Sequence, residues 1–433
     1  MTSTIRRRAR WAAVAALLAA GVTACGSIGY TTYSSSHPAT PIRGSATDGA
    51  TSGERSIGTA TSGNGTASSG STGSATGTTP SGGPGGAGQP GVAGSGSGSA
   101  GGTLNGGGIA AGRGGGAAAP VAAPWSAAPA PGGSGSFLFG SDSAFGLSVA
   151  RAPVAANSAA TVAILADDVT RQGAGVNWQR WNVAFYSVPA GTTRVSVRFA
   201  DCFASGTVPP VFTAAMSAVP IPADAQPALA DDRHMAIYDA ATDQLWEMWR
   251  AENTPSGWQA CWGGRIDNAS QAAGYFSDGG GATASKLSMA GTMITLAEAR
   301  AGRINHAVYL VVPTVRADSW SYPAQRTDGN STNADAVMEG QRLRLDPSLD
   351  VAKLGLTPFG AMVARAAQQY GFIVVDKAGA VGVVTESGLP TKVLTGTDPW
   401  PGLLQLGTYD QYRLLAGFPW NRLQALPPDY GRP

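Results

Sequence analysis

The chain has 433 residues, a formal net charge of +2 at pH 7 and only 13% charged residues. A chain with so little net charge and no basic stripe is not expected to bind nucleic acid. Of its 61 glycines, 30 fall between residues 41 and 135, so composition alone separates a low-complexity segment from a globular one.

The first 25 residues, MTSTIRRRARWAAVAALLAAGVTAC, have the layout of an export signal. Four arginines among residues 6–10 precede an apolar stretch at 11–22, which is shorter than a comfortable membrane span. The small residues before Cys25 resemble the lipobox of bacterial lipoproteins, in which the cysteine is acylated and becomes the first mature residue. We therefore expect residues 1–24 to be a lipoprotein signal peptide. The alternative is a plain signal peptide with a chance cysteine.

Acyl chains on Cys25 would anchor the protein to a membrane, because each buried CH₂ group favours the bilayer. The expected location is extracytoplasmic, on the outer membrane or the cell surface, since Gly26 rather than an aspartate follows the cysteine. Residues 25–135 are expected to form a tether. From about residue 41 this segment is dominated by Gly, Ser, Thr and Ala, which cannot bury enough apolar surface to offset the entropy of folding. A disordered coil of this length would reach roughly 55–60 Å.

Residues 136–433 have a globular composition and are predicted to form one mainly β domain. Helices are expected at 157–169, at 295–304 and at 357–370, the last with Thr357 as its cap and Gly371 after its end. Strands are expected at 181–188, 193–200, 257–264, 306–312, 337–345, 372–376 and 380–384, and as a hairpin at 234–249. Short strands with few helices favour an antiparallel β-sandwich or jelly roll with a few short peripheral helices.

Two cysteines remain beyond Cys25, at Cys202 and Cys261. Outside the cytoplasm two such cysteines usually form a disulfide, and a loop of about 60 residues closed in this way would be stabilised by roughly 3–4 kcal/mol. A reactive thiol is the alternative, although no histidine stands near either cysteine in the sequence.

The order of motifs beyond residue 140 resembles a largely uncharacterised family of bacterial secreted β-rich proteins. The motifs are the hairpin with its Trp-Glu pair, GRINHA at 302–307, GQRLRL at 340–345 and YGFIVVD at 370–376. The resemblance implies an exported β-rich domain and carries no activity. Relatives more often show P-M-G before the arginine strand, where this chain has Met338-Glu339-Gly340, so the resemblance assigns no role to Glu339.

The hairpin HMAIYDAATDQLWEMW at 234–249 is the strongest candidate for one wall of a site. With its turn centred on Ala241-Thr242, Asp239 pairs with Gln244 and Ala236 with Glu247. Side chains alternate between the two faces of a strand. One face then carries the core residues Met235, Ile237, Trp246 and Met248. The other carries His234, Ala236, Tyr238, Leu245, Glu247 and Trp249.

A carboxylate among aromatic rings is suited to holding a sugar, because rings offer flat apolar faces and the carboxylate accepts hydroxyl hydrogen bonds. The candidate catalytic residues are therefore Glu247, His234 and His306, and the candidate binding residues are Tyr238, Trp249, Trp258, Arg303 and Asp328. A glycosidase commonly needs a second carboxyl group. Asp239, Asp328, Glu339 and Asp376 are the possibilities. In the alternative interpretation, Glu247 is ion-paired to Arg250 or Arg303 and both histidines are structural.

The segment DGNSTNADAVME at 328–339 partly fits a calcium-binding loop. Oxygen-bearing residues stand at positions one, three and five and Glu339 at twelve, but Asn333 replaces the glycine needed at six. The favoured interpretation is a polar surface loop with no cofactor, and a Ca²⁺ site is the alternative. Zinc motifs and a nucleophile elbow are lacking in the globular region.

These features predict a lipid-anchored module that binds a polysaccharide or envelope glycan. Cleavage by a hydrolase or lyase mechanism is left open. The alternatives are a non-catalytic surface or adhesion protein and an envelope-assembly factor with protein partners.

Overall fold

The computed structural model describes residues 138–140 and 143–433, which fold as one unit. The predicted signal peptide, Cys25 and the tether to residue 135 lie outside the described residues. Within the described residues no helix combines the length and the apolar character that a bilayer span requires.

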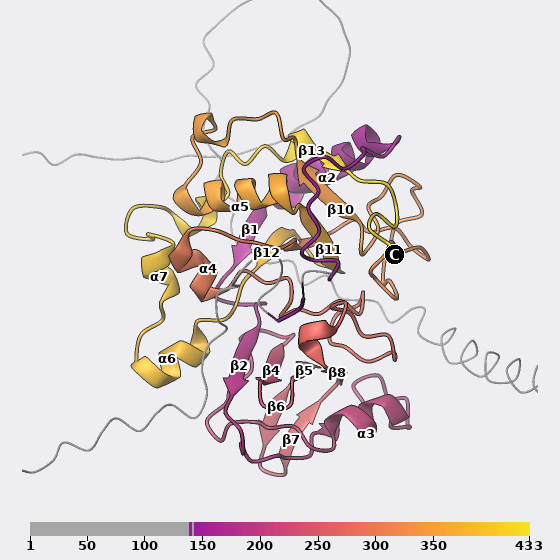
Figure 1. Ribbon diagram of the computed structural model, residues 1–433, viewed down its shortest axis with the longest axis vertical. Coiled ribbons are helices and arrows are strands. Elements are labelled where there is room, and N and C mark those ends of the chain that lie inside the picture. The colour runs from indigo at the N-terminus through magenta and orange to yellow at the C-terminus, as the bar shows by residue number, and fades with distance from the viewer. Residues whose placement is uncertain (1–137, 141–142) are drawn as a thin grey trace, which may run out of the picture. The chain divides into compact units, whose positions relative to one another are not determined.

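A six-stranded sheet is the largest element of the fold (Figure 1). Its order is β1 (Ala174–Asn177), β12 (Val381–Val384), β9 (Val308–Val312), β11 (Phe372–Lys377), β10 (Arg342–Leu345) and β13 (Leu423–Ala425). The pairs β1–β12 and β9–β11 are parallel, and the remaining pairs are antiparallel. The strands β11 and β12 follow one another in sequence, yet β9 lies between them.

Two smaller sheets complete the β structure. The four-stranded sheet has the order β2 (Ala184–Val188), β4 (Met235–Asp239), β5 (Gln244–Trp249) and β8 (Trp262–Asp267), and the three-stranded sheet has the order β3 (Arg198–Phe199), β7 (Gly257–Ala260) and β6 (Glu252–Thr254). Each contains a parallel pair, β2–β4 in one and β3–β7 in the other. The mainly β class is confirmed, but the sheets are mixed, because chain crossovers replace several of the hairpins that a purely antiparallel arrangement needs.

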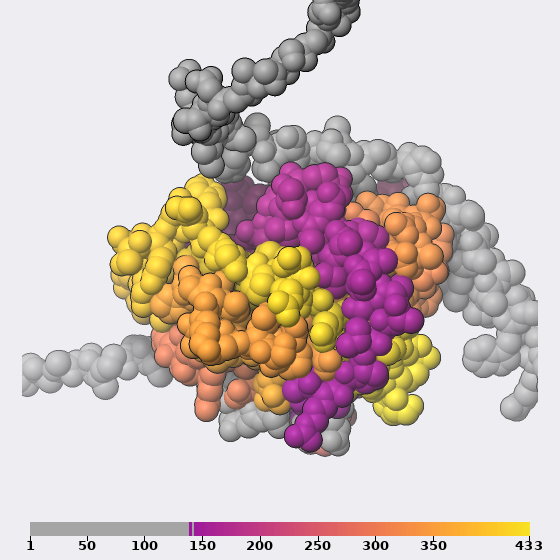
Figure 2. Space-filling model, turned by 90° about the horizontal axis from the view of Figure 1, so that it is seen from above, coloured from indigo at the N-terminus to yellow at the C-terminus, as the bar shows by residue number. Residues whose placement is uncertain are grey.

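The helices are α2 (Ser158–Gln172), α3 (Pro210–Met216), α4 (Leu296–Ala301), α5 (Pro358–Gln369), α6 (Leu389–Thr395) and α7 (Trp400–Leu403). The three predicted helices are present, and the hydroxyl of Thr357 accepts a hydrogen bond from Gly360 N–H as the predicted cap of α5. From above, α2 forms part of the magenta surface that meets the yellow C-terminal segment, where α2 packs against β13 (Figure 2).

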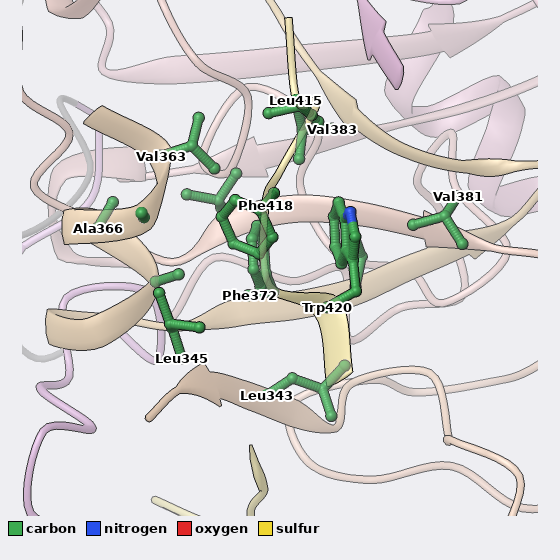
Figure 3. Close-up of a cluster of buried hydrophobic side chains, with 14 of the residues drawn as sticks. Leu343, Leu345, Val363, Ala366, Phe372, Val381, Val383, Leu415, Phe418 and Trp420 are labelled. Carbon is green, nitrogen blue, oxygen red and sulfur yellow. The ribbon is translucent and has the colours of Figure 1, made fainter. Parts of the chain in front are cut away.

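The three largest hydrophobic clusters of the described residues hold these layers together. The first packs α5 and the C-terminal segment onto one face of the six-stranded sheet, where Phe372, Phe418 and Trp420 meet (Figure 3). The second contains residues of the opposite face, such as Ile373, together with Phe185 and Leu245 of the four-stranded sheet. The third covers the far face of the four-stranded sheet with α3. The hairpin β4–β5 therefore lies between two cores.

Candidate functional site

The hairpin β4–β5 has the register that the sequence predicts. Ala236 lies opposite Glu247, and Asp239 lies opposite Gln244. The predicted core face is buried in the third cluster, with Met235, Ile237, Trp246 and Met248 at 0–1% exposure. The opposite face lies toward the second cluster, which includes Ala236 and Leu245.

Glu247 on that face is completely buried. Its carboxylate accepts hydrogen bonds from the Ser288 hydroxyl at 2.7 Å, from Ala290 N–H at 2.9 Å and from Met289 N–H at 3.1 Å. Burial raises the pKa of Glu247 to about 7, although these three hydrogen bonds act in the opposite direction. Within the described residues Glu247 forms no ion pair with Arg250 or Arg303. Its contacts fasten the 288–290 segment to the sheet.

His306 is also completely buried and lies 3.1 Å from a carboxylate oxygen of Glu298. Burial alone would lower the pKa of His306, but the charge and hydrogen bond of Glu298 outweigh it and raise that pKa. Burial favours protonation of Glu298, yet His306 holds the pKa of that carboxyl below its usual value. Glu298 also accepts a hydrogen bond from Thr295 N–H and thereby caps α4. The histidine is thus tied to the start of a helix.

The other predicted site residues have separate surroundings. His234 is buried, and burial lowers its pKa while the nearby charge of Asp232 opposes that shift. The Tyr238 hydroxyl donates to Asp243 of the turn at 2.9 Å. Trp258 is buried in the third cluster and Arg303 is exposed. Among the described residues no hydrogen bond or ion pair joins Glu247, His234 and His306 to one another, so their catalytic roles stay a prediction.

Trp249 lies at the end of β5 and belongs to a stack of side chains. The Phe203 ring lies nearly parallel to it, with centroids 5.8 Å apart and planes at 17°. The Arg250 guanidinium lies 4.8 Å from the Trp249 ring centroid. The indole N–H donates to Asp232 at 3.0 Å, which fixes the ring's orientation. We call Phe203, Trp249 and Arg250 the aromatic–arginine platform.

The predicted disulfide between Cys202 and Cys261 is confirmed, with Cα atoms 5.4 Å apart. It fixes the exposed residue Phe203, which is next to Cys202, against the loop between β7 and β8. Phe203 is 52% exposed, an unusual state for so large an apolar side chain. Phe203 is not among the site residues predicted from the sequence, although its place beside a predicted disulfide cysteine is a usable signal.

A surface hollow of about 430 Å³ adjoins the platform and is lined by Ala230, Asp231, Arg233 and Arg250. Three of these residues have positive φ angles, at 83° for Ala230, 38° for Arg233 and 53° for Arg250. Such angles cost non-glycine residues about 1–3 kcal/mol each and are concentrated at functional sites. Arg250 N–H donates to the Asp232 carbonyl at 2.7 Å, which helps to hold this backbone in place.

Three carboxyl groups gather elsewhere, at the end of β11. One oxygen each from Asp328, Glu339 and Asp376 lie within 4.8 Å of one another. Glu339 is completely buried, while Asp328 and Asp376 are half-buried. These are three of the four residues that the sequence offered as a second carboxyl group. The fourth, Asp239, instead forms an ion pair with Arg194 at 2.7 Å.

We call these three carboxyl groups the carboxyl cluster, and two of them, Glu339 and Asp376, have strongly raised pKa values. Burial, followed by the charges of Asp376 and Asp328, raises the pKa of Glu339 to about 10. Burial, followed by the charges of Asp328 and Asp232, raises the pKa of Asp376 to about 8. Asp232 therefore faces both sites, because it also accepts the Trp249 N–H.

The comparisons with known proteins assign this chain to no family. Family models, curated proteins and solved structures were searched, and none matched. The resemblance to exported β-rich proteins stays a prediction, and the chemistry of both sites has to be inferred from their residues.

Proposed function

We propose that the chain is a lipid-anchored, outward-facing module that binds a polysaccharide on the aromatic–arginine platform. The observation that carries this proposal is the half-exposed ring of Phe203, stacked on Trp249 beside an arginine-lined hollow. Sugar rings have apolar C–H faces that pack on aromatic rings.

The residues around the hollow supply the polar half of such a site. Within the described residues Arg250 has no ion pair, so its guanidinium can donate to sugar hydroxyl or carboxylate oxygens. Arg233 forms an ion pair with Glu252 at 3.2 Å and presents a second guanidinium to the same hollow. Asp231 provides a hydrogen-bond acceptor on its wall.

Several constraints would fix the platform before a ligand arrives. The disulfide anchors the Phe203 segment, and Asp232 holds the Trp249 ring through its N–H. A site fixed in advance loses less entropy on binding, which favours affinity. Glu247 and His306 are both at 0% exposure and so do not reach a surface glycan, which favours a binding role for the platform over cleavage by these two residues.

The experiment is a binding assay of the full-length chain against a panel of neutral and acidic polysaccharides, by affinity electrophoresis and co-sedimentation. We expect Phe203→Ala and Arg250→Ala each to weaken binding by about tenfold, equivalent to about 1.4 kcal/mol. Tyr412→Ala and Arg413→Ala are matched controls, because they remove an exposed aromatic ring and an exposed arginine from another surface. Wild-type protein that binds none of the glycans, or platform variants that bind as well as wild type, would contradict the proposal.

The proposed lipid anchor on Cys25 can be tested separately. Cys25→Ser should move the protein from the membrane fraction to the soluble fraction and abolish incorporation of labelled fatty acid. A chain that stays membrane-bound and unlabelled in both forms would exclude acylation at this cysteine. Reducing-end release, measured on the same glycan panel, separates a binding module from a hydrolase.

A further inference from the structure

We propose that Asp328, Glu339 and Asp376 bind one hard divalent cation, with Ca²⁺ the best match. The proposal concerns a different set of residues from the glycan platform and does not depend on it. Oxygen-only donors favour Ca²⁺, Mg²⁺ or Mn²⁺ over metals that prefer nitrogen or sulfur ligands. The ligands are the three carboxylate oxygens that lie within 4.8 Å of one another.

That separation matches the size of a calcium site. Calcium–oxygen distances are about 2.3–2.6 Å, so two ligands of one ion can stand at most about 5 Å apart. Three oxygens within 4.8 Å of one another can therefore all contact a single ion. Half-buried Asp328 and Asp376 leave a side from which water can complete the coordination.

The hydrogen bonding of Glu339 is an independent sign of a ligand. Glu339 is completely buried, and within the described residues neither of its carboxyl oxygens has a hydrogen-bond partner. The nearby Asp328 carboxyl raises the pKa of Glu339 and the Thr327 hydroxyl lowers it, but neither group makes a hydrogen bond of normal geometry with the Glu339 oxygens. Asp328 Oδ1 is likewise buried and unpartnered. Buried polar groups are nearly always satisfied, and a cation would satisfy these three oxygens together.

The charges around the cluster agree with a divalent ion. Three carboxylates face one lysine, since Lys377 Nζ lies 3.7 Å from Asp328 Oδ2 and donates to the Asp328 carbonyl at 2.9 Å. Three negative charges and one positive charge sum to −2, and Asp232 near Asp376 brings the sum to −3. A divalent cation would offset two of these negative charges. Without a cation, this cluster can reduce its repulsion only by taking up protons.

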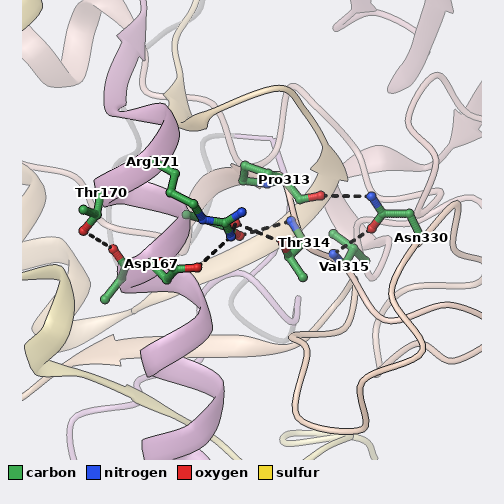
Figure 4. Close-up of polar contacts among 9 residues, drawn as sticks. Asp167, Thr170, Arg171, Pro313, Thr314, Val315 and Asn330 are labelled. Atoms are coloured by element: carbon green, nitrogen blue, oxygen red, sulfur yellow. Dashed lines mark hydrogen bonds and ion pairs between the residues drawn. The ribbon is translucent and has the colours of Figure 1, made fainter. Parts of the chain in front are cut away.

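The backbone around the cluster is arranged to hold it. Asp328 begins the 328–339 segment and Glu339 ends it, the first and twelfth positions of the calcium-loop pattern. Asn330 at position three does not join them. Its side chain instead accepts from Val315 N–H at 3.3 Å and donates to the Pro313 carbonyl at 3.4 Å (Figure 4).

The third ligand comes from a different part of the chain, because Asp376 stands near the end of β11. The site is thus a loop joined to a sheet rather than a calcium loop between two helices. Gly340 follows Glu339 in the chain and has a φ of 82°, and this backbone conformation helps to position Glu339. A Cβ at position 340 would collide with the carbonyl oxygen of Ser321, so only glycine fits there. A bound ion would clamp this loop onto the six-stranded sheet.

The test is Ca²⁺ titration of the full-length chain after EDTA treatment and desalting, by calorimetry and by thermal unfolding. We expect one site per chain, with a dissociation constant of about 10⁻⁴–10⁻³ M as in extracellular modules, and a midpoint temperature that rises with Ca²⁺. Glu339→Gln should abolish both responses. Asp335→Asn removes a carboxylate from the same loop but outside the cluster and should retain both. Titrations with Mg²⁺ and Mn²⁺ show which of the three ions binds with the highest affinity.

Asp328→Asn serves as the second variant if Glu339→Gln does not fold, because the Asp328 side chain is 28% exposed and tolerates change more readily. No binding of Ca²⁺, Mg²⁺ or Mn²⁺ to wild-type protein would overturn the proposal, and so would cluster variants that bind Ca²⁺ as wild type does. The platform variant Phe203→Ala should bind Ca²⁺ as wild type does. The glycan-binding proposal and the Ca²⁺ proposal can therefore fail independently of each other.

Discussion

Replacing Glu247 by glutamine should change how the stability of the protein depends on pH. The Glu247 carboxyl group is fully buried, and its pKa is raised from the usual 4.5 to about 7. An acid that holds its proton more strongly in the folded state loses folded-state stability as the pH rises between the two pKa values. Glutamine cannot ionise and therefore removes this loss.

The magnitude follows from the two pKa values. Each tenfold change in acid strength corresponds to about 1.4 kcal/mol, so the full effect is about 3 kcal/mol. Stabilisation of the neutral form is complete below pH 4.5 and is lost as the pH rises through about 7. Between pH 5 and pH 8 the free energy of unfolding of Glu247→Gln should rise, relative to wild type, by about 2.5 kcal/mol.

The assay is urea unfolding followed by tryptophan fluorescence at pH 5, 6, 7 and 8, with the disulfide intact. The quantity of interest is the difference between variant and wild type at each pH, because other titrating groups cancel in it. Glu252→Gln, which removes a half-exposed carboxyl group, is the control for the loss of one charge. A difference that stays constant from pH 5 to pH 8 would refute the reasoning, since the carboxyl would then ionise equally easily in both states. Glycan binding by Glu247→Gln should be unchanged.

Three further changes test other parts of the fold. Breaking the Cys202–Cys261 disulfide with reductant should lower the free energy of unfolding by about 4 kcal/mol in the chain-entropy model for its separation of 59 residues, measured by urea unfolding against the oxidised chain. His306→Gln should cost about 3–5 kcal/mol at pH 6 because it leaves buried Glu298 without its partner. The raised pKa of His306 means that this cost should shrink as the pH rises through it; an equal cost at pH 6 and at pH 9 would contradict the ion pair. Gly340→Ala should lower the free energy of unfolding by more than about 1 kcal/mol because of its positive φ, and so lower the midpoint of thermal unfolding, whereas Gly379→Ala, with open space around it, should do neither.

Local patterns in the sequence predicted local structure well. The register of β4–β5 follows from alternation and one turn, and α5 follows from Thr357, Pro358 and Gly371 acting together. The pairing of Cys202 with Cys261 needed only the expectation of an oxidising compartment and the count of cysteines. Each of these inferences depends on residues close in sequence or on a choice with few alternatives.

Contacts between distant segments could not be predicted in the same way. Asp328, Glu339 and Asp376 were all suggested as carboxyl partners of Glu247, but nothing in their spacing showed that they meet one another instead. Strand order was equally hidden, since β9 pairs with both β11 and β12. Parallel pairing is set by the packing of crossovers, and alternation within a strand does not reveal its neighbour.

The position of β9 between β11 and β12 determines when the largest sheet can form. The last two strands are adjacent in sequence but cannot close as a local hairpin, because a strand made much earlier has to lie between them. Among the described strands, the earliest, β1, pairs only with β12, and β13 supplies the opposite edge of the sheet. Assembly by such long-range contacts is slow. A chain synthesised from its N-terminus would therefore stay without its central sheet until nearly all of it had emerged, and its exposed strands would need protection from aggregation during that interval.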